Sequence, residues 1–142
     1  MNQFRQFGED IVLGPQPSRE DLDEARRRGI RSVIDLRMAH ETPTDNRALA
    51  EQSGMQYASI PVDKNRLSPD QLAALDRALA ELPGPHLIHC ASGARAALLL
   101  CVSEARRLGW NADETFEKAK SLGFDLQNSP EMAEFVRRSV AQ

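Results

Sequence analysis

Residues 86–99, HLIHCASGARAALL, contain a cysteine and an arginine whose types and spacing could do chemistry. Cys90 follows a short apolar run, four residues separate it from Arg95, and Gly93 lies between them. The glycine lets a turn adopt backbone angles that other residues resist. Where such a turn opens a helix, its backbone N–H groups and the helix dipole favour an anion. We therefore expect an oxyanion such as phosphate or sulfate to bind the loop of Ala91, Ser92, Gly93, Ala94 and Arg95.

The same loop could activate the cysteine. A helix N-terminus and a neighbouring cation stabilise a thiolate and lower a cysteine pKa from about 8.5 to about 3.5–7.5. The planar guanidinium of Arg95 can hold two oxygens of a tetrahedral anion. A nucleophile and an oxyanion clamp would then meet in one place, which suits covalent catalysis on phosphate or sulfur transfer through a persulfide. Cys101, within the apolar segment AALLLCV, is instead predicted to be an inert core residue.

The elements that must position this loop follow from hydrophobic patterning and from helix start and stop signals. Short apolar, β-branched runs predict strands over 10–14, 31–37, 55–62 and 85–89. Ser, Asn and Ser-Pro start signals, together with Gly stops, predict helices between these strands and after the last one. The expected helices follow Ser18, cover 45–53, follow Ser68-Pro69, cover 95–108, and follow Asn111 and Ser129-Pro130.

Strands that alternate with helices through short links form a mostly parallel sheet. We therefore predict one α/β domain over residues 1–142, with three layers and a four- to five-stranded sheet flanked by helices. In such sheets, ligands bind beyond the carboxyl ends of the strands. The segment from Cys90 to Arg95 follows such an end.

Composition narrows the classes of function. The 142 residues carry a net charge of −3, with 27% charged and 41% hydrophobic residues, as in an ordinary soluble domain. Because no dominant basic surface is expected, nucleic acid is not the predicted partner. No apolar run approaches the ~20 residues of a membrane span, and the N-terminus lacks a signal-peptide core. We expect a cytoplasmic protein with free thiols, no membrane partner, no cofactor and no metal site.

The loop HCASGAR resembles the signature loop of cysteine-dependent protein tyrosine and dual-specificity phosphatases. The likeness extends to the bacterial beta-lactamase hydrolase-like phosphatase-like family, whose order and spacing of motifs match over about residues 7–110. The matching segments are IVLGPQPS, GIRSVIDLR followed by Glu41, YASIPVD, LSPDQL and GPHLIHCASGARAALL. The resemblance implies a dual-specificity phosphatase-like fold and a phosphorylated substrate, either a small molecule or a phosphoprotein.

Residue by residue, the resemblance implies that Cys90 is the nucleophile and that Arg95 holds the phosphate. His89 would support the thiolate from the strand side. Asp63, in IPVDKN, would be the general acid that protonates the leaving oxygen and later helps to activate water. Gln16, in GPQPS, would face the site. The charged residues that would brace the loops, without taking part in the chemistry, are Asp35, Arg37 and Glu41.

The chain departs from the wider phosphatase superfamily in three ways. Four residues separate Cys90 from Arg95 where most tyrosine phosphatases have five, a spacing that the bacterial family shares. Ala96 and Ala97 stand where a hydroxyl residue usually follows the arginine, so hydrolysis of a phosphocysteine could be slower. The alignment of Asp63 with the usual acid is off by one position.

Two other functions fit the same loop. Rhodanese-type sulfurtransferases commonly use Cys-x-x-Gly-x-Arg, although they usually carry a GHIPGA-like stretch, which the segment after DLR lacks. A phospho-ligand binding module with little catalytic activity would also fit the missing hydroxyl and the displaced acid. Hydrolysis of phosphate monoesters, including phosphotyrosine, through a phosphocysteine is the function that the sequence favours.

Overall fold

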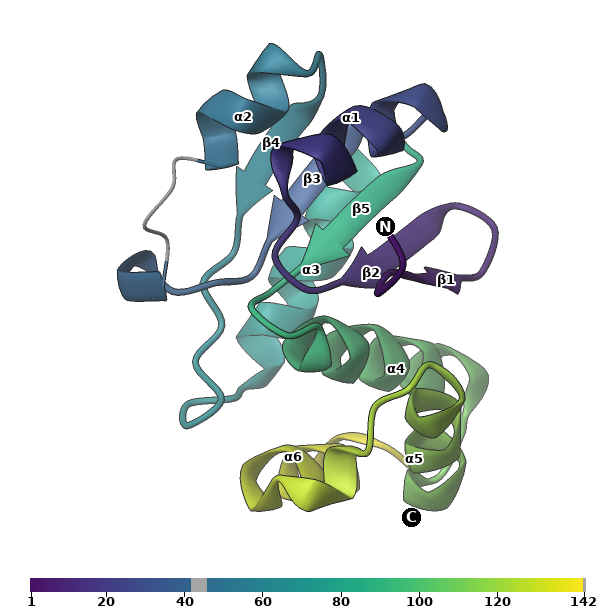
Figure 1. Cartoon of the computed structure of the whole chain (residues 1–142). Coiled ribbons are helices and arrows are strands. Elements are labelled where there is room, and N and C mark those ends of the chain that lie inside the picture. The colour runs from purple at the N-terminus through teal and green to yellow at the C-terminus, as the bar shows by residue number, and fades with distance from the viewer. Residues whose placement is uncertain (42–45, 142) are drawn as a thin grey trace.

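The computed structural model describes residues 1–41 and 46–141, and the strands form one sheet at its centre (Figure 1). The strand order is β1-β2-β5-β3-β4. Only β1 runs antiparallel to its neighbour, so the predicted mostly parallel α/β sheet is confirmed, with five strands. The strands are β1 (Arg5–Phe7), β2 (Ile11–Gly14), β3 (Ser32–Asp35), β4 (Gln56–Ser59) and β5 (His86–His89).

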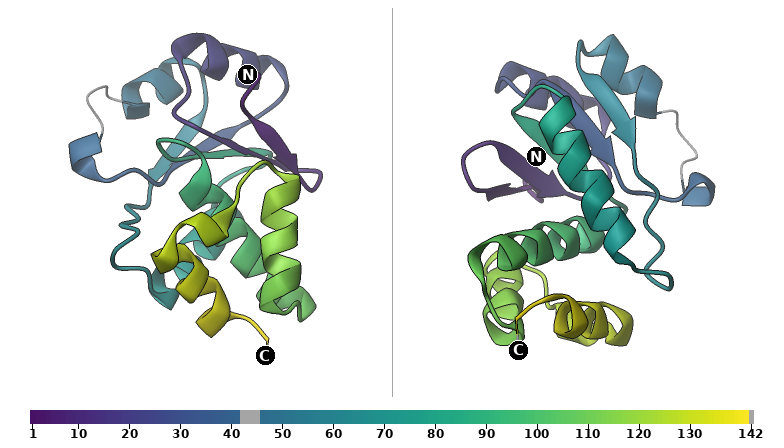
Figure 2. Two further views of the ribbon diagram at one scale, coloured as in Figure 1. Left: turned by 60° about the horizontal axis from the view of Figure 1, so that its bottom comes forward. Right: turned by 180° about the vertical axis from the view of Figure 1, so that it is seen from behind.

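Helices cover both faces of the sheet, which gives the predicted three layers (Figure 2). Two lie on one face: α1 (Arg19–Arg27) and α2 (Asn46–Gln52). Four lie on the other: α3 (Pro69–Glu81), α4 (Ala94–Leu108), α5 (Ala112–Ser121) and α6 (Pro130–Ser139). Two short 3-10 turns complete the described elements: η1 (Ala39–Glu41) and η2 (Leu126–Asn128).

Successive side chains of the buried strands point to opposite faces of the sheet, and they contribute to two hydrophobic cores. Val33 and Leu87 point to the layer of α1 and α2, whereas Ile34 and Ile88 point to the layer of α4. Eight residues of α4 are buried, because this helix packs against the sheet and also against α3, α5 and α6. Its central position fixes the start of α4, and therefore the loop that precedes it, against the sheet.

Three helices start with the capping boxes that the sequence indicates. Ser18 pairs with Asp21, Ser68 with Gln71 and Asn111 with Glu114, each satisfying backbone N–H groups at a helix start. Cys101 is fully buried in the α4 core, as predicted, and both cysteines are free thiols.

The structure differs from the prediction at the strand boundaries. Strand β1 was not predicted, because its three residues are mostly exposed and show no apolar alternation. The predicted strands over 31–37 and 55–62 end earlier, at Asp35 and Ser59. The first residue of the helix predicted over 45–53 lies outside the described residues, and the rest agrees with α2 to within one residue. In the described part of the chain, none of the helices could cross a membrane, since none is both long and apolar enough.

Candidate active site

The carboxyl ends of four parallel strands meet at one edge of the sheet. Gly14 and Asp35 are both in register with His89, and Asp35 is also in register with Ser59. The loops that follow these four residues therefore lie side by side. Every site residue that the sequence indicated stands in or beside one of these loops.

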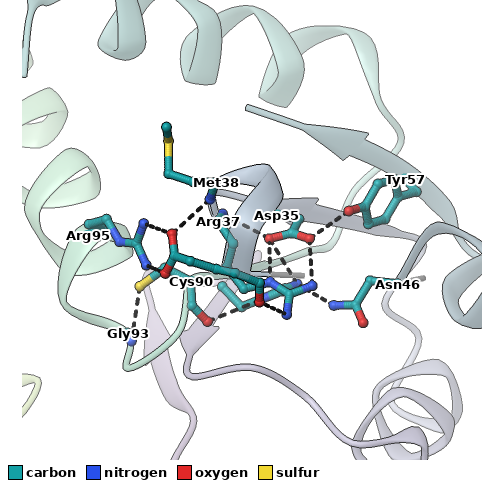
Figure 3. Close-up of polar contacts among 10 residues, drawn as sticks. Asp35, Arg37, Met38, Asn46, Tyr57, Cys90, Gly93 and Arg95 are labelled. Carbon is teal, nitrogen blue, oxygen red and sulfur yellow. Dashed lines mark hydrogen bonds and ion pairs between the residues drawn. The ribbon is translucent and has the colours of Figure 1, made fainter. Parts of the chain in front are cut away.

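The loop after β5 encloses the sulfur of Cys90. The backbone N–H of Gly93 donates to Cys90 Sγ at 3.0 Å, so the chain turns back around the thiol (Figure 3). The loop is fixed to the end of β2, because Cys90 N donates to Gly14 O and Gln16 N donates to Ala91 O. Cys90 itself is fully buried, whereas Ala91 and Ser92 are exposed. The thiol therefore lies beneath a turn whose outer residues face solvent.

Gly93 is required at the start of α4 for two reasons. Its φ of +102° is in the left-handed region that L side chains rarely adopt. A Cβ at this position would also lie 2.7 Å from Cζ of Phe124 and 3.3 Å from the carbonyl carbon of Gly14. The glycine predicted from the turn thus also permits close packing between three segments of the chain.

Arg95 is held by a carboxylate that is distant in the sequence. Its Nη1 and Nη2 donate to the two oxygens of Glu41 at 2.8 and 2.7 Å, and Nη1 also donates to Val62 O at 2.9 Å. These hydrogen bonds raise the pKa of Arg95 and lower that of Glu41 to about 2. Both groups are therefore charged at neutral pH. A guanidinium has five N–H donors, so this brace leaves part of the planar fork for an anion.

A buried charge network lies under the loops. Arg37 is fully buried and donates from Nε and Nη2 to the two oxygens of Asp35, each at 3.0 Å. The hydroxyl of Tyr57 donates to Asp35 Oδ2 at 2.6 Å. These bonds lower the pKa of Asp35 despite its burial, which opposes the charge, and they supply the partners that a buried ion pair needs.

The network connects the sheet to the arginine at the site. Arg37 Nη1 donates to the backbone carbonyl of Glu41 at 3.4 Å, and Met38 N donates to Glu41 Oε1 at 2.9 Å. Glu41 in turn holds Arg95. Asp35, Arg37 and Glu41 therefore do brace the loops, and the residue that they finally orient is Arg95.

His89 belongs to the same buried layer. Its Nδ1 lies 3.3 Å from the carbonyl oxygen of Cys90, and its Nε2 lies 3.3 Å from Nδ2 of Asn46. Burial lowers the pKa of His89 to about 4, so the ring is neutral at pH 7. A neutral ring satisfies both neighbours when Nδ1–H donates to the carbonyl and Nε2 accepts from Asn46. The contact between His89 and Cys90 is thus made through the backbone carbonyl of Cys90.

An open cleft of about 690 Å³ lies over the loop. Asp63 is partly exposed, lines this cleft together with Arg95, and accepts a hydrogen bond from Asn65 N. Gln16 stays beside the loop through its backbone, but its exposed side chain is not part of the lining. The lining residues are Met38, His40, Glu41, Asp63, Lys64, Asn65, Ser92, Ala94, Arg95, Gly123, Phe124, Asp125, Leu126, Asn128, Ser129 and Met132.

Sequence reasoning missed the far wall of the cleft. Residues 123–132, after α5, contribute Phe124 and Met132 to the lining. Nothing in their sequence indicated a site, because they contain only ordinary turn and helix-start signals. The contacts of Tyr57 with Asp35 and of Asn46 with His89 were also not predicted, because each joins residues that are far apart in the sequence. Within residues 1–41 and 46–141, no group of three or more His, Cys, Asp or Glu side chains could hold a metal ion.

The fold and the loop together define a class. A mostly parallel sheet whose central strand leads through a Cys-to-Arg loop into a buried helix is here the arrangement of a phosphatase-like domain. Within this class, the chain belongs to the phosphatase-like domain family of beta-lactamase hydrolase-like proteins, whose profile matches residues 3–107. The resemblance stated from the motifs is therefore confirmed.

Known proteins resemble this chain in sequence and in fold. A beta-lactamase hydrolase-like protein of Xylella fastidiosa is 32% identical over 125 residues, which are 84% of this chain and 29% of that protein. The chain thus spans about 29% of the length of this curated relative. A candidate phosphatase from Neisseria meningitidis Z2491 is 23% identical with a TM-score of 0.80, over 96% of this chain and 99% of the other. The complex of Pseudomonas aeruginosa TpbA with phosphotyrosine is 18% identical with a TM-score of 0.76, over 95% and 83% of the two chains.

Proposed function

We propose that the chain is a cysteine-dependent phosphatase that hydrolyses phosphate monoesters through a phosphocysteine intermediate. One observation carries this proposal. The sulfur of Cys90 is enclosed by the loop and bonded by the Gly93 N–H, while Arg95 is braced by Glu41 beside the same loop. A nucleophile and an oxyanion clamp are thereby preorganised, and such preorganisation contributes strongly to catalysis of group transfer.

The proposed reaction has two steps. The Cys90 thiolate attacks phosphorus, the S–P bond forms, and the ester P–O bond breaks as Asp63 gives its proton to the leaving oxygen. Water then attacks the phosphocysteine, Asp63 takes a proton from that water, and the S–P bond breaks to release phosphate and the thiolate. Arg95 and the loop N–H groups hold the phosphoryl oxygens in both steps. Because the thiol must stay reduced, this chemistry suits a reducing compartment such as the cytoplasm.

The comparisons support a phosphorylated substrate. The related fold of Pseudomonas aeruginosa TpbA was solved with phosphotyrosine bound. The family to which this chain belongs is itself defined as phosphatase-like. We therefore propose phosphate monoesters, including phosphotyrosine, as the substrates of this chain.

A sulfurtransferase is the second candidate, and one observation favours it. The positions after Arg95 are Ala96 and Ala97, both fully buried, so no hydroxyl stands there to assist phosphocysteine hydrolysis. In sulfur transfer, the Cys90 thiolate would take the outer sulfur of thiosulfate, releasing sulfite and forming a persulfide. A nucleophile such as cyanide would then take that sulfur as thiocyanate and restore the thiolate. This cycle needs no hydroxyl after the arginine.

Two assays on one preparation test the proposal. Hydrolysis of p-nitrophenyl phosphate and transfer of sulfur from thiosulfate to cyanide are measured for the natural chain, Cys90→Ser, Arg95→Lys and Cys101→Ser. We expect phosphate hydrolysis that Cys90→Ser abolishes while phosphate binding persists, because a serine hydroxyl is a far poorer nucleophile in the same loop. Arg95→Lys should weaken both binding and rate, since a point charge cannot replace the planar fork.

Cys101→Ser is the matched control. Its thiol is buried in the core, and that burial raises its pKa to about 12, so the substitution should lower stability but leave the chemistry intact. Sulfur transfer without phosphate hydrolysis would replace the proposal with the sulfurtransferase. Phosphate binding without either activity would instead assign a phospho-ligand binding module.

A further inference from the structure

The far wall of the cleft is built by a segment that the family profile does not include. The profile matches residues 3–107, whereas the wall comes from residues 123–132, which follow α5 and include the start of α6. In Figure 2, this segment runs beside the start of α4, where the Cys-to-Arg loop ends. Its apolar lining residues are Phe124, Leu126 and Met132, and its polar ones are Asp125, Asn128 and Ser129.

Phe124 is a wall residue that contacts the loop directly. Two atoms of its ring, Cζ and Cε1, lie 2.7 and 3.0 Å from the position that a Cβ of residue 93 would occupy. The ring therefore packs directly on Gly93, whose N–H holds the sulfur of Cys90. It is only half-buried, so part of its surface remains available within the cleft.

The turn that carries Phe124 is well fixed. The N–H of Phe124 donates to Ala119 O at 2.9 Å, and Gly123 adopts a φ of +94°, as expected just beyond the end of a helix. The side chain of Asp125 then accepts from Gln127 N and caps η2. The ring is thus presented by two consecutive capped turns, which limits the conformational entropy that it would lose on binding a ligand.

The charges along the cleft bear on the kind of ligand. Among the residues that the structure describes, three carboxylates line it, those of Glu41, Asp63 and Asp125, against the cationic groups of Arg95 and Lys64. Glu41 already pairs with Arg95. Beyond the phosphate loop, the described part of the walls therefore offers no excess of positive charge to a second or third phosphate group. A ligand with a single phosphate and an uncharged remainder fits this balance better.

We propose that Phe124 is a specificity-determining residue whose ring contacts the group esterified to the phosphate, and that the preferred substrates are monophosphates of aromatic or flat apolar alcohols. The inference rests on the proposed function in one respect, since it places the phosphate in the loop of residues 90–95. The inference adds that the far wall of the cleft selects the group that is esterified to the phosphate. Contact with an aromatic ring is worth about three- to tenfold in affinity.

Binding of three anions that cannot turn over tests the inference independently of catalysis. Calorimetry measures phenylphosphonate, methylphosphonate and inorganic tripolyphosphate with the natural chain, Phe124→Leu, Phe124→Ala and the control Gln127→Ala. Gln127 is exposed in the same turn and does not line the cleft. We expect phenylphosphonate to bind the natural chain about three- to tenfold more tightly than methylphosphonate. Phe124→Ala should abolish that preference, and Phe124→Leu should reduce it.

The affinity for methylphosphonate should stay within about twofold in every variant, because this probe reaches only the loop. Equal weakening of both phosphonates in Phe124→Leu would show a merely structural role and overturn the inference. Tighter binding of tripolyphosphate than of phenylphosphonate would overturn it as well, as would the absence of any phosphonate binding.

Failure of the proposed function looks different. If no phosphate ester is hydrolysed but the phenylphosphonate preference depends on Phe124, the inference about Phe124 is supported and the phosphatase proposal is wrong. If p-nitrophenyl phosphate is hydrolysed with the same KM in the natural chain and in Phe124→Ala, the phosphatase proposal is supported and the inference about Phe124 is wrong.

Discussion

Two carboxylates of the cleft differ in the role that their positions allow. Asp63 follows β4 at the sheet edge where the Cys-to-Arg loop lies, whereas Asp125 caps η2 on the far wall. We expect Asp63→Asn to lower turnover by about 10²–10⁴ on esters with poor leaving groups, because only these need a proton on the departing oxygen. The loss should be much smaller on p-nitrophenyl phosphate, and comparing kcat for aryl and alkyl phosphates measures the difference.

Asp125→Asn is the control for that experiment. It removes one negative charge from the same cleft, while an asparagine can still cap the turn. It should therefore reproduce any general electrostatic effect without the dependence on the leaving group. Equal losses of Asp63→Asn on both kinds of ester would exclude Asp63 as the general acid.

His89 makes stability depend on pH. Burial lowers its pKa to about 4 in the folded chain, from about 6.5 in an unfolded one. Between these values the unfolded chain binds the proton that the folded chain excludes, so stability is complete above about pH 6.5 and falls as the pH drops towards 4. The linked loss amounts to about 3 kcal/mol at most.

Urea unfolding at pH 7 and at pH 4.5 measures this loss. His89→Asn keeps a donor near the carbonyl of Cys90 but has no proton to gain, so its stability should change less between the two pH values. A pH dependence as steep as that of the natural chain would assign the effect to other groups.

At the scale of the elements, the segment between β3 and η1 connects the sheet with the reactive loop. Arg37 is its anchor, since it pairs with Asp35 in the core and holds the carbonyl of Glu41. We expect Arg37→Leu to lower the free energy of unfolding by about 3–5 kcal/mol, because it leaves the Asp35 carboxylate buried without its cation. Arg27→Leu, at an exposed ion pair on α1, should cost no more than about 0.5 kcal/mol.

Urea unfolding of the two variants gives the comparison directly. Activity supplies a second measurement, since loosening of Glu41 should also raise the KM of Arg37→Leu for p-nitrophenyl phosphate. Similar stabilities of the two variants would mean that the buried pair contributes no more than a surface one.

At the scale of the whole molecule, the far wall packs against the loop of residues 90–95 where Phe124 meets Gly93. Gly93→Ala places a methyl group against the ring at a positive φ, whereas Gly109→Ala has a positive φ with open space around it. Both substitutions should lower the free energy of unfolding by about 1–2 kcal/mol, because alanine disfavours a positive φ. Only Gly93→Ala should lower it by about 1–3 kcal/mol more, because its methyl group collides with the ring.

A double-mutant cycle tests that coupling. In the Phe124→Ala background, the extra cost of Gly93→Ala over Gly109→Ala should shrink, because the atoms that collide are gone. Free energies of unfolding from denaturant titration supply all the values. An unchanged excess would place the strain elsewhere, for example against the backbone of Gly14.

Much of the molecule could be predicted from the sequence because the signals are local. Capping boxes at Ser18, Ser68 and Asn111 set helix starts within four residues of chain, and apolar runs identified four of the five strands. The order of strands and helices then required a mostly parallel sheet. With it, the carboxyl end of β5 became the expected location of the Cys-to-Arg loop.

Only the tertiary structure decided which side chains surround that loop. Glu41 and Arg95 are 54 positions apart, and no pattern in either segment specifies their bidentate pairing. Phe124 reaches Gly93 only because α5 and α6 pack beside α4. The helix-start and turn signals around residues 123–132 fix the local backbone, but the contact itself depends on helix packing. Local propensity therefore determined the elements and the Cys-to-Arg loop. The brace of Arg95 by Glu41 and the far wall of the cleft arose instead from long-range packing, which residue spacing does not encode.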